Sequence, residues 1–205
     1  MSSGIAGRFR YVRHFLSCFP APKGVRCGEG ARVQFPRRIS GGRFISLGCR
    51  TEVGADPMIA AISESAGERF SPSVEIGDDV YIGPHLYLVC VSSIKIGRGA
   101  VLSEHVFIAD VSHGISPEDG PIMKQRLVPG GPISIGENTF LGFRSSVMAG
   151  VSIGKHCVIG SNTVVTKSIP DYCLVVGNPG RIIKRYDFES KTWLRVAHED
   201  SEAAR

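Results

Sequence analysis

The 205-residue sequence lacks several features that would define a protein class. No apolar run approaches the roughly 20 residues that a membrane-spanning helix needs. None of the six cysteines lies in a CxxC pair, which argues against zinc-ribbon and thioredoxin-like sites. We see no secretory signal peptide, and we therefore expect free thiols in a reducing cytoplasm.

Aromatic residues are also scarce, and acidic residues are scarce in the first 50 positions. Aromatics make up 8%, whereas glycine occurs 25 times, which indicates many tight turns and short strands. Residues 1–50 hold ten Lys and Arg against a single acid, Glu29, and residues 51–205 carry a net charge of −4. This basic segment could contact anionic lipid or an anionic substrate, or be an ordinary solvated surface. No nucleic-acid motif accompanies it, so we expect no nucleic-acid partner.

A six-residue period dominates the second half of the chain. From position 135 to 165 a branched aliphatic residue or leucine stands at every sixth position, and glycine follows four of the six. The six are Ile135, Leu141, Val147, Ile153, Ile159 and Val165. The register recurs over 76–88 and, after a slip of two residues, over 96–108, with a weaker echo over 33–45.

A period of six fits neither an α-helix nor a plain strand. In a helix, successive aliphatic residues would turn by about 240° and spread over three faces. In a long strand, the recurring glycine would weaken the pairing. A solenoid fits, because each hexapeptide can form one side of a triangular prism and successive coils can pair as parallel strands. The sequence therefore predicts an all-β fold, a parallel β-helix, in preference to a β-sandwich with a chance period.

Three runs of the sequence carry a resemblance to a known family. IGDDVYIG, SIGKHCVIGSNTVVTKSIP and VVGNPGRIIKRY resemble the hexapeptide-repeat acyltransferases, closely over 74–186 and loosely over 25–60. The resemblance implies a left-handed parallel β-helix, a hand that the spacing itself does not give. It also implies acetyl-CoA as donor substrate and a homotrimer with clefts between subunits.

The repeat divides the chain into three parts. We expect a helical or irregular N-terminal cap over 1–24, a β-helix over 25–180 and a C-terminal segment over 181–205 that ends in a short helix and a loose tail. Residues 61–72 are expected to form a loop between coils.

The break in the repeat over 110–132 is the expected catalytic loop, because solenoids place insertions on the outside and such loops often carry function. Its polar residues include Asp110, His113, Glu118, Asp119, Lys124, Gln125 and Arg126. His113 is the candidate general base, and Asp110 could orient its ring. The D-x-x-H pattern alone also fits a surface pair. In the family, a His at the start of this insertion is the base, and HG with the downstream PI…Q…L resembles the branch that acetylates surface-polysaccharide sugars.

The other histidines are weaker candidates. His85, His105 and His156 occupy the fourth hexapeptide position, which is commonly a solvated corner. The His-x4-His pair of the zinc-binding hexapeptide enzymes is missing, so we expect no metal.

The resemblance also implies which residues bind the donor. The T-K pair of VVTKSIP, the small residue of GSN and the basic positions of GNPGRIIK match family positions, and a backbone N–H at LGF is the candidate oxyanion donor. These candidates are Gly142, Phe143, Ser161, Thr166, Lys167, Arg181 and Lys184. The bulk of Phe143 would favour acetyl over longer acyl groups.

The acceptor side is less defined. Related sugar acetyltransferases use Asn and Asp in a stretch that here reads VCVSSIKIG and offers only Ser92 and Ser93. Gln125 and Arg126 of the insertion are the other candidates for substrate binding. The acceptor sugar and the acetylated position therefore stay open.

These observations predict an acetyl-CoA-dependent O-acetyltransferase that acts on a sugar hydroxyl in bacterial surface-polysaccharide biosynthesis (LPS O-antigen, capsule or exopolysaccharide). Transfer would be direct, with Cys90 and Cys157 as nucleophiles only if ping-pong kinetics appear. One alternative is N-acetylation of a nucleotide-linked amino sugar. Another is a non-catalytic scaffold or surface-binding subunit. We expect a cytoplasmic location, with peripheral contact at the inner membrane as an option.

Overall fold

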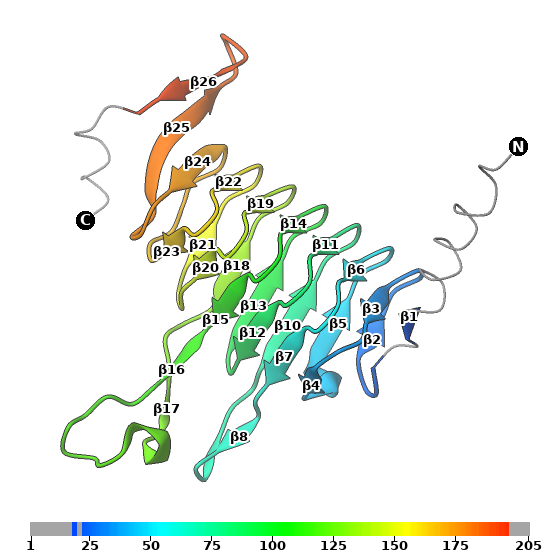
Figure 1. Ribbon diagram of the computed structural model, residues 1–205, viewed down its shortest axis with the longest axis vertical. Helices are drawn as coiled ribbons and strands as arrows, with labels where there is room; N and C mark the ends of the chain where they lie inside the picture. Colours follow the sequence, from blue (N-terminus) through cyan, green and yellow to red (C-terminus); the bar gives the residue numbers. More distant parts are fainter. Residues whose placement is uncertain (1–17, 20–21, 197–205) are drawn as a thin grey trace, which may run out of the picture.

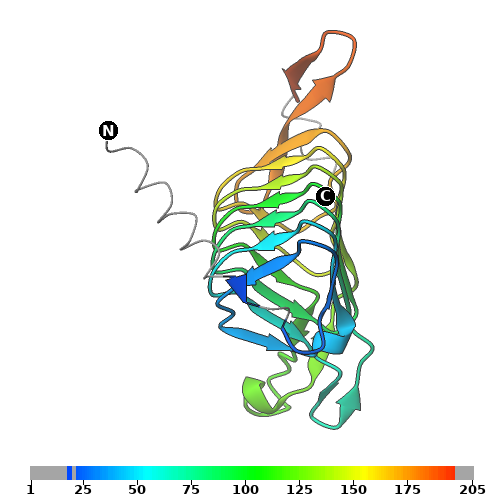
Figure 2. The ribbon, with the colours of Figure 1, turned by 90° about the vertical axis from the view of Figure 1, so that its right-hand side faces the viewer.

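The computed structural model describes residues 18–19 and 22–196, which form a triangular prism of stacked coils (Figure 1). Three sheets make the sides of the prism, and the strands of the six-stranded sheets are parallel. The predicted all-β fold with parallel coils is therefore confirmed. Figure 2 shows the coils stacked along the prism, with short strands joined by turns at its edges.

The strands are as follows. The first sheet contains β1 (Cys18–Phe19), β3 (Arg32–Gln34), β6 (Glu52–Val53), β11 (Tyr81–Ile82), β14 (Val101–Leu102), β19 (Phe140–Leu141), β22 (Val158–Ile159), β24 (Cys173–Val176), β25 (Arg181–Asp187) and β26 (Thr192–Arg195). The second contains β2 (Arg26–Cys27), β5 (Ile45–Leu47), β10 (Ser73–Ile76), β13 (Ser93–Ile96), β18 (Ile133–Ile135) and β21 (Ser152–Ile153). The third contains β4 (Arg38–Ser40), β7 (Met58–Ala61), β12 (Tyr87–Cys90), β15 (Phe107–Ala109), β20 (Ser146–Val147) and β23 (Val164–Val165).

The core is the interior of the prism, where the aliphatic residues of the repeat stack coil upon coil. All six predicted positions from Ile135 to Val165 are at most 2% exposed. On the second sheet, for example, Ile76 pairs in register with Leu47 on one side and Ile96 on the other. Each coil thus buries its apolar side chains against its two neighbours, which is how a solenoid is stabilised.

Where glycine follows the aliphatic residue, the close approach of the next coil requires it. A Cβ at Gly142 would lie 2.7 Å from the backbone nitrogen of Ser161, and one at Gly136 would lie 2.4 Å from the carbonyl carbon of Gly154. Neither contact is tolerable for a real side chain, so these positions need glycine to let backbones stack.

Two edges of the prism carry the candidate site residues. We call the edge between the third and second sheets the loop edge, because it carries η1 (Gly42–Phe44), the hairpin of β8 (Glu64–Ser65) and β9 (Glu68–Arg69), and the 110–132 insertion. We call the edge between the first and third sheets the histidine edge, because His85 and His105 form its turns with left-handed φ values of 64° and 58°.

The end segments differ from expectation. The C-terminal segment was expected to end in a short helix, yet β25 and β26 form an antiparallel hairpin on β24. The alternating exposure along Arg181–Tyr186 is the two-residue period of a strand, which explains the difference. At the N-terminus, β1 pairs antiparallel with β3. Apart from residues 22–24, the rest of the expected cap over 1–24 lies outside the described residues. Among the described residues, no helix is long and apolar enough to cross a membrane.

Candidate functional site

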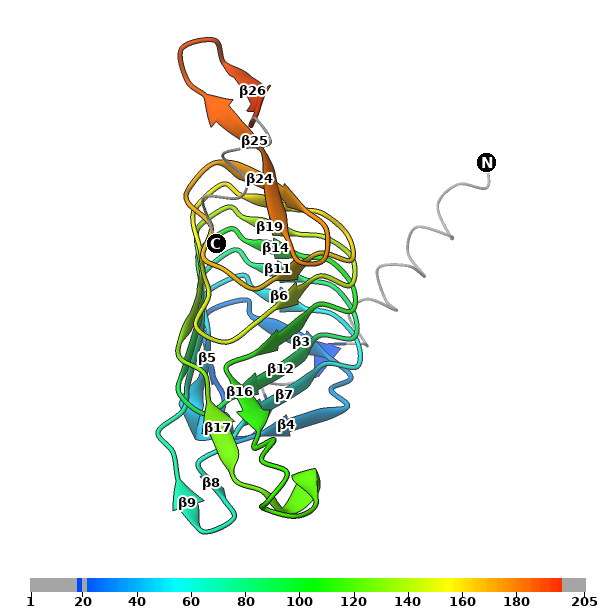
Figure 3. The same cartoon turned by 90° about the vertical axis from the view of Figure 1, so that its left-hand side faces the viewer.

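The 110–132 insertion protrudes from the loop edge beside the β8–β9 hairpin (Figures 1 and 3). Its base is an antiparallel ladder of β16 (Val111–His113) and β17 (Leu127–Pro129), and η2 (Ile122–Lys124) lies in its outer part. Arg126 reaches the neighbouring excursion, where its Nη1 lies 2.9 Å from Oε1 of Glu68. This ion pair links the insertion to the β8–β9 hairpin. The two protrusions lie on either side of the short corner between β12 and β13.

His113 ends β16 and is half-buried at the base of this insertion. Its Nδ1 is buried and has no hydrogen-bond partner among the described residues. A base that acts through Nε2 needs its other ring nitrogen to hold a proton, which normally means an acceptor close by. The chain positions the imidazole but leaves the atom that would orient it without a partner.

Asp110 does not supply that partner, contrary to the expectation of an Asp–His pair. The Asp110 side chain is fully buried, and its carboxylate accepts hydrogen bonds from the N–H groups of Val91 and Ser92, both at 2.8 Å. Asp110 lies at the bend between β15 and β16, and its side chain turns into the prism. There it accepts the N–H groups of Val91 and Ser92, which have no backbone carbonyl of the next coil beside them because the chain leaves the prism at this corner as the insertion.

The thiol of Cys90 completes this buried cluster, 3.4 Å from the Asp110 carboxylate. Burial raises the pKa of Cys90 to about 12, and the Asp110 charge adds to the rise. Burial likewise raises the pKa of Cys157 to about 11. A thiol must ionise to act as a nucleophile, so neither cysteine suits a covalent acyl-enzyme.

The remaining acceptor candidates have different surroundings. Ser92 and Ser93 are half-buried at the corner between β12 and β13, on the loop edge that also carries His113. Gln125 is 9% exposed, and its amide is engaged inside the insertion: Nε2 donates to the carbonyls of Ser116 and Gly120, and Oε1 accepts from Ser116 N–H. The structure thus gives Gln125 the role of holding the loop, and Arg126 that of tying it to the β8–β9 hairpin.

The donor candidates divide between two edges. Gly142, Phe143 and Ser161 lie on the histidine edge. Thr166 and Lys167 are exposed on the loop edge beyond β23.

The other two candidate cations, Arg181 and Lys184, lie in β25, and Arg181 is its first residue. Gly180, which precedes Arg181, donates its N–H to the carbonyl of Val164, and Arg181 itself is exposed. Lys184 is half-buried opposite Leu174.

Only one of the two expected oxyanion donors remains. The N–H of Gly142 donates to the carbonyl of Ile159 at 2.8 Å as part of the pairing between coils. It is therefore committed to the fold, which corrects that part of the expectation. The N–H of Phe143, at the turn that follows, remains the candidate.

The histidine edge also holds a hollow of about 400 Å³ that sequence reasoning missed. Its lining includes the corner histidines that the repeat position had marked as solvated. The lining residues are Arg37, Asp56, Met58, His85, Leu86, Tyr87, His105 and Phe107. The missed signal was the alternation in PHLY and EHVF, which places a histidine and an aromatic residue two apart in successive coils.

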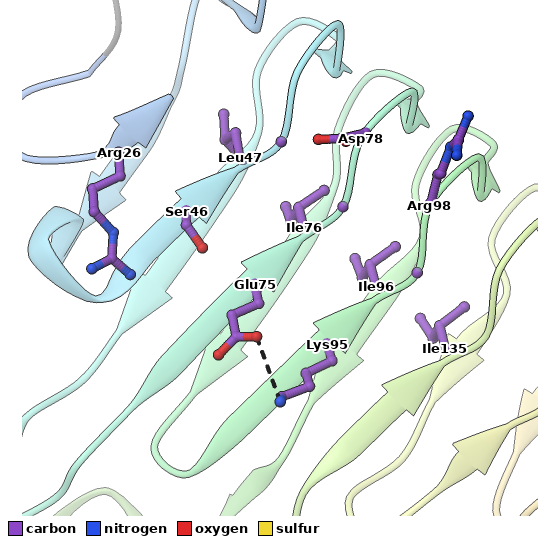
Figure 4. A pocket seen from close by; sticks show the side chains of 13 residues that line it. Arg26, Ser46, Leu47, Glu75, Ile76, Asp78, Lys95, Ile96, Arg98 and Ile135 are labelled. Atoms are coloured by element: carbon purple, nitrogen blue, oxygen red, sulfur yellow. Dashed lines mark ion pairs between the residues drawn. The ribbon is translucent and has the colours of Figure 1, made fainter. Parts of the chain in front are cut away.

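A second hollow, of about 490 Å³, lies over the second sheet (Figure 4). Glu75 and Lys95 face each other across neighbouring strands there, with 3.5 Å between Nζ and Oε2. It lies on a different side of the prism from Phe143 and shares no lining residue with the insertion. We therefore assign it no part in the chemistry.

Comparisons with known proteins agree with this architecture. The family model described as "Hexapeptide repeat of succinyl-transferase" matches residues 132–167. The chain is 27% identical to the "Putative lipopolysaccharide biosynthesis O-acetyl transferase WbbJ" of Escherichia coli (strain K12), over 94% of this chain and 95% of that protein. It is 29% identical to the "Probable acetyltransferase Rv3034c" of Mycobacterium tuberculosis over 78% of this chain, and there it spans 55% of the relative.

Among solved structures, AntD, an N-acyltransferase from Bacillus cereus, superposes with a TM-score of 0.64 at 18% identity. The match covers 89% of this chain and 90% of AntD. This likeness shows the fold, a left-handed parallel β-helix. Together with the repeat and the relative that matches over 94% of this chain, it shows that the chain resembles the hexapeptide-repeat acyltransferases.

Proposed function

We propose that the protein transfers the acetyl group of acetyl-CoA to a sugar hydroxyl during the synthesis of a bacterial surface polysaccharide such as lipopolysaccharide O-antigen. The observation that carries this proposal is the likeness to the putative lipopolysaccharide O-acetyl transferase, which covers 94% of the chain. The protruding insertion with a half-buried histidine at its base supports it.

His113 acts as the general base. Its Nε2 takes the proton of the acceptor hydroxyl as the oxygen attacks the thioester carbonyl, and the N–H of Phe143 bonds the oxyanion that develops. The imidazolium of His113 then protonates the departing CoA thiolate, so the proton balance closes without an acyl-enzyme. The high thiol pKa values of Cys90 and Cys157 support direct transfer.

We further propose that the active site forms between two copies in a homotrimer. In one chain, His113 lies on the loop edge while Phe143 and Ser161 lie on the histidine edge, at a different corner of the prism. A neighbouring copy whose histidine edge faces the loop edge would bring the base to the thioester. The buried, unpartnered Nδ1 of His113 supports such a neighbour.

Mixed assemblies test this arrangement. Chains with His113→Ala keep the histidine edge, and chains with Ser161→Trp keep the base but fill the expected pantetheine path. Random co-assembly of two inactive chains should restore about a quarter of wild-type activity if each site uses one edge from each of two neighbours. Continued inactivity of mixtures that light scattering shows to be trimeric would place the site within one chain.

We propose a cytoplasmic location with peripheral contact at the inner membrane. The five cysteines whose side chains are described are all free, as in a reducing compartment. The first coils expose Lys23, Arg26, Arg37, Arg38 and Arg43, and each Lys or Arg near an anionic leaflet contributes about 1 kcal/mol. Sedimentation with phosphatidylglycerol vesicles at low salt, and none with phosphatidylcholine, is the expected result.

The donor site can be tested first and by itself. Acetyl-CoA at 100 times its Kd should stabilise the protein by about 2.7 kcal/mol, a shift of several degrees in the thermal midpoint. The shift should shrink in a Lys167→Ala/Arg181→Ala double variant and persist in the control Lys95→Ala, which lies over the second sheet. A wild-type protein that acetyl-CoA does not stabilise would contradict the acetyltransferase proposal and favour a scaffold.

A second candidate is N-acylation of a nucleotide-linked amino sugar. The observation that favours it is the likeness of fold to AntD, which was solved with dTDP and 3-hydroxybutyryl-CoA. The two reactions give different products, because mild alkali removes an O-acetyl ester and leaves an N-acetyl amide. Product analysis with hydroxyl and amino sugars side by side therefore separates them, and transfer to amino sugars alone would replace the O-acetyl proposal.

A further inference from the structure

We propose that the 110–132 insertion of one copy docks on the outer face of the first sheet of a second copy, through apolar side chains on both. This inference rests on the proposed function, because it names the surface that joins two copies at the proposed active site. Its test measures contact between chains and needs no acetyl transfer, so the two can fail separately.

The insertion exposes several apolar side chains although its shape is fixed. Ile115 is 82% exposed, and Ile122 and Met123 of η2 are 53% and 79% exposed. Gln125 holds this part of the insertion through its hydrogen bonds to Ser116 and Gly120. Apolar groups gathered on one protruding and well-anchored segment indicate a surface that a partner covers.

An apolar stripe runs along the outer face of the first sheet. Tyr81, Val101 and Phe140 hold the same outward position in β11, β14 and β19, where they pair in register. They are 48%, 36% and 40% exposed. Val158 and Leu174 continue the stripe in register and are half-buried.

The second sheet shows that the coil geometry does not require such a stripe. Its own outward row is polar throughout, although it belongs to the same coils. The row consists of Arg26, Ser46, Glu75, Lys95, Ser134 and Ser152. An apolar row on one side of the prism and a polar row on another distinguish a covered side from a solvated one.

The proposed arrangement of copies brings the insertion to this stripe. The third sheet lies between the loop edge and the histidine edge of each chain. In a closed ring in which the loop edge of one copy meets the histidine edge of the next, the third sheet therefore faces the ring axis. The first sheet begins on the other side of the histidine edge and lies outside. An insertion that extends past that edge reaches the first sheet of the neighbour.

The positions along the prism also agree. The insertion leaves the coil that contains β14 and returns to the coil that contains β19 (Figure 1). Equal coils lie at equal height in a ring whose axis is parallel to the prisms, so the insertion meets Val101 and Phe140. The ladder of β16 and β17, three residues long, carries its outer part about 10 Å from the edge. Docked there, the insertion would close one side of a site between His113 and Phe143 of the neighbour.

Disulfide trapping on the full chain tests the proposal. In a background with Cys18→Ser, Cys27→Ser and Cys49→Ser, chains with Met123→Cys and chains with Val101→Cys carry different tags, are co-expressed and are oxidised with copper phenanthroline. We expect a product at twice the chain mass that carries both tags and disappears on reduction. Phe140→Cys, one coil further, provides a second trapping position with the same expected result.

The matched control is Lys95→Cys. Lys95 stands in the same coil as Val101 but on the polar outer face of the second sheet, so it should form no mixed product with Met123→Cys. Tyr87→Cys reports on the third sheet in the same way. The proposal is overturned if neither Val101→Cys nor Phe140→Cys gives the mixed product. It is also overturned if Lys95→Cys, Tyr87→Cys or Met123→Cys alone gives as much product.

Stabilisation of the wild-type protein by acetyl-CoA separates the two levels of the argument. A protein that acetyl-CoA stabilises but whose variants give no mixed product keeps the donor site and loses the docking surface. A protein whose variants give the mixed product but that acetyl-CoA does not stabilise keeps the docking surface and loses the proposed function.

Discussion

Asp110→Asn separates two roles that the same carboxylate could have. In the structure the two carboxylate oxygens accept the N–H groups of Val91 and Ser92, both at 2.8 Å, in a fully buried position. An asparagine at this position keeps one acceptor oxygen, but its amide group faces the second N–H with donors only. One charge-assisted hydrogen bond is lost, and one buried N–H is left without a partner.

The magnitude follows from these contacts. A hydrogen bond to a charged group contributes about 1.5–3 kcal/mol, and an unsatisfied buried donor costs a similar amount. We therefore expect Asp110→Asn to lower the free energy of unfolding by about 2–3 kcal/mol. At about 2–4 °C per kcal/mol for a chain of this size, the thermal midpoint should fall by about 4–12 °C. Asp119→Asn, an exposed change in the same insertion, should leave it unchanged.

The kinetic outcome distinguishes the roles. If Asp110 oriented His113, its change to Asn would favour the wrong tautomer, which costs about 10⁴ in kcat in an Asp–His–Ser triad. The geometry predicts instead a fall in kcat of less than tenfold, measured well below the thermal midpoint, with the acid limb of the pH–rate profile unmoved. A stable Asp110→Asn protein that has lost about 10³-fold or more in kcat would refute this reasoning.

Three further predictions follow from the fold and the site. His113→Ala should lower kcat several hundredfold or more, because base catalysis contributes about 10²–10⁴, while calorimetry shows unchanged acetyl-CoA affinity; full activity would remove His113 from its role. Gly142→Ala should destabilise the protein by about 2 kcal/mol or more, because its Cβ would lie 2.7 Å from the Ser161 nitrogen; an unchanged denaturation midpoint would show that the coils can separate without cost. Stability should also fall above about pH 9, because the unfolded chain then loses thiol protons that the folded chain keeps on Cys90 and Cys157, whose pKa values are raised to about 12 and 11. Thermal midpoints between pH 8 and 10.5 would measure that slope, which Cys157→Ala should reduce and Ser152→Ala should not.

The fold could be predicted from the sequence because each six-residue repeat forms one side of the prism. Each aliphatic residue of the repeat is buried for the same reason, and glycines such as Gly136 and Gly142 meet the backbone of the next coil, so the signal is repeated along the chain. The C-terminal hairpin does not repeat. The many charged residues of this segment obscure its two-residue strand period, and the expectation of a helix there was wrong.

The candidate site could be predicted less completely, for physical reasons. The sequence located the insertion and His113, but spacing along the chain does not tell which side of a backbone a residue faces. Asp110 therefore looked like a partner of His113, although it turns inward to the amides of Val91 and Ser92. His85 and His105 looked solvated because each is a corner residue by itself. Only the stacking of coils brings their rings together, with centroids 4.5 Å apart.

The proposed division of the active site between the two edges follows from how a solenoid accommodates function. A change at an inward position affects the coil above and the coil below as well as its own coil. Turns and excursions at the edges are free of this constraint, so catalytic groups are expected along the edges. A single prism places its edges on different sides of the core, as it does with His113 and Phe143. A reaction that needs both groups is then most simply served by a second copy, which brings one edge against another while the coils that build each edge stay unchanged.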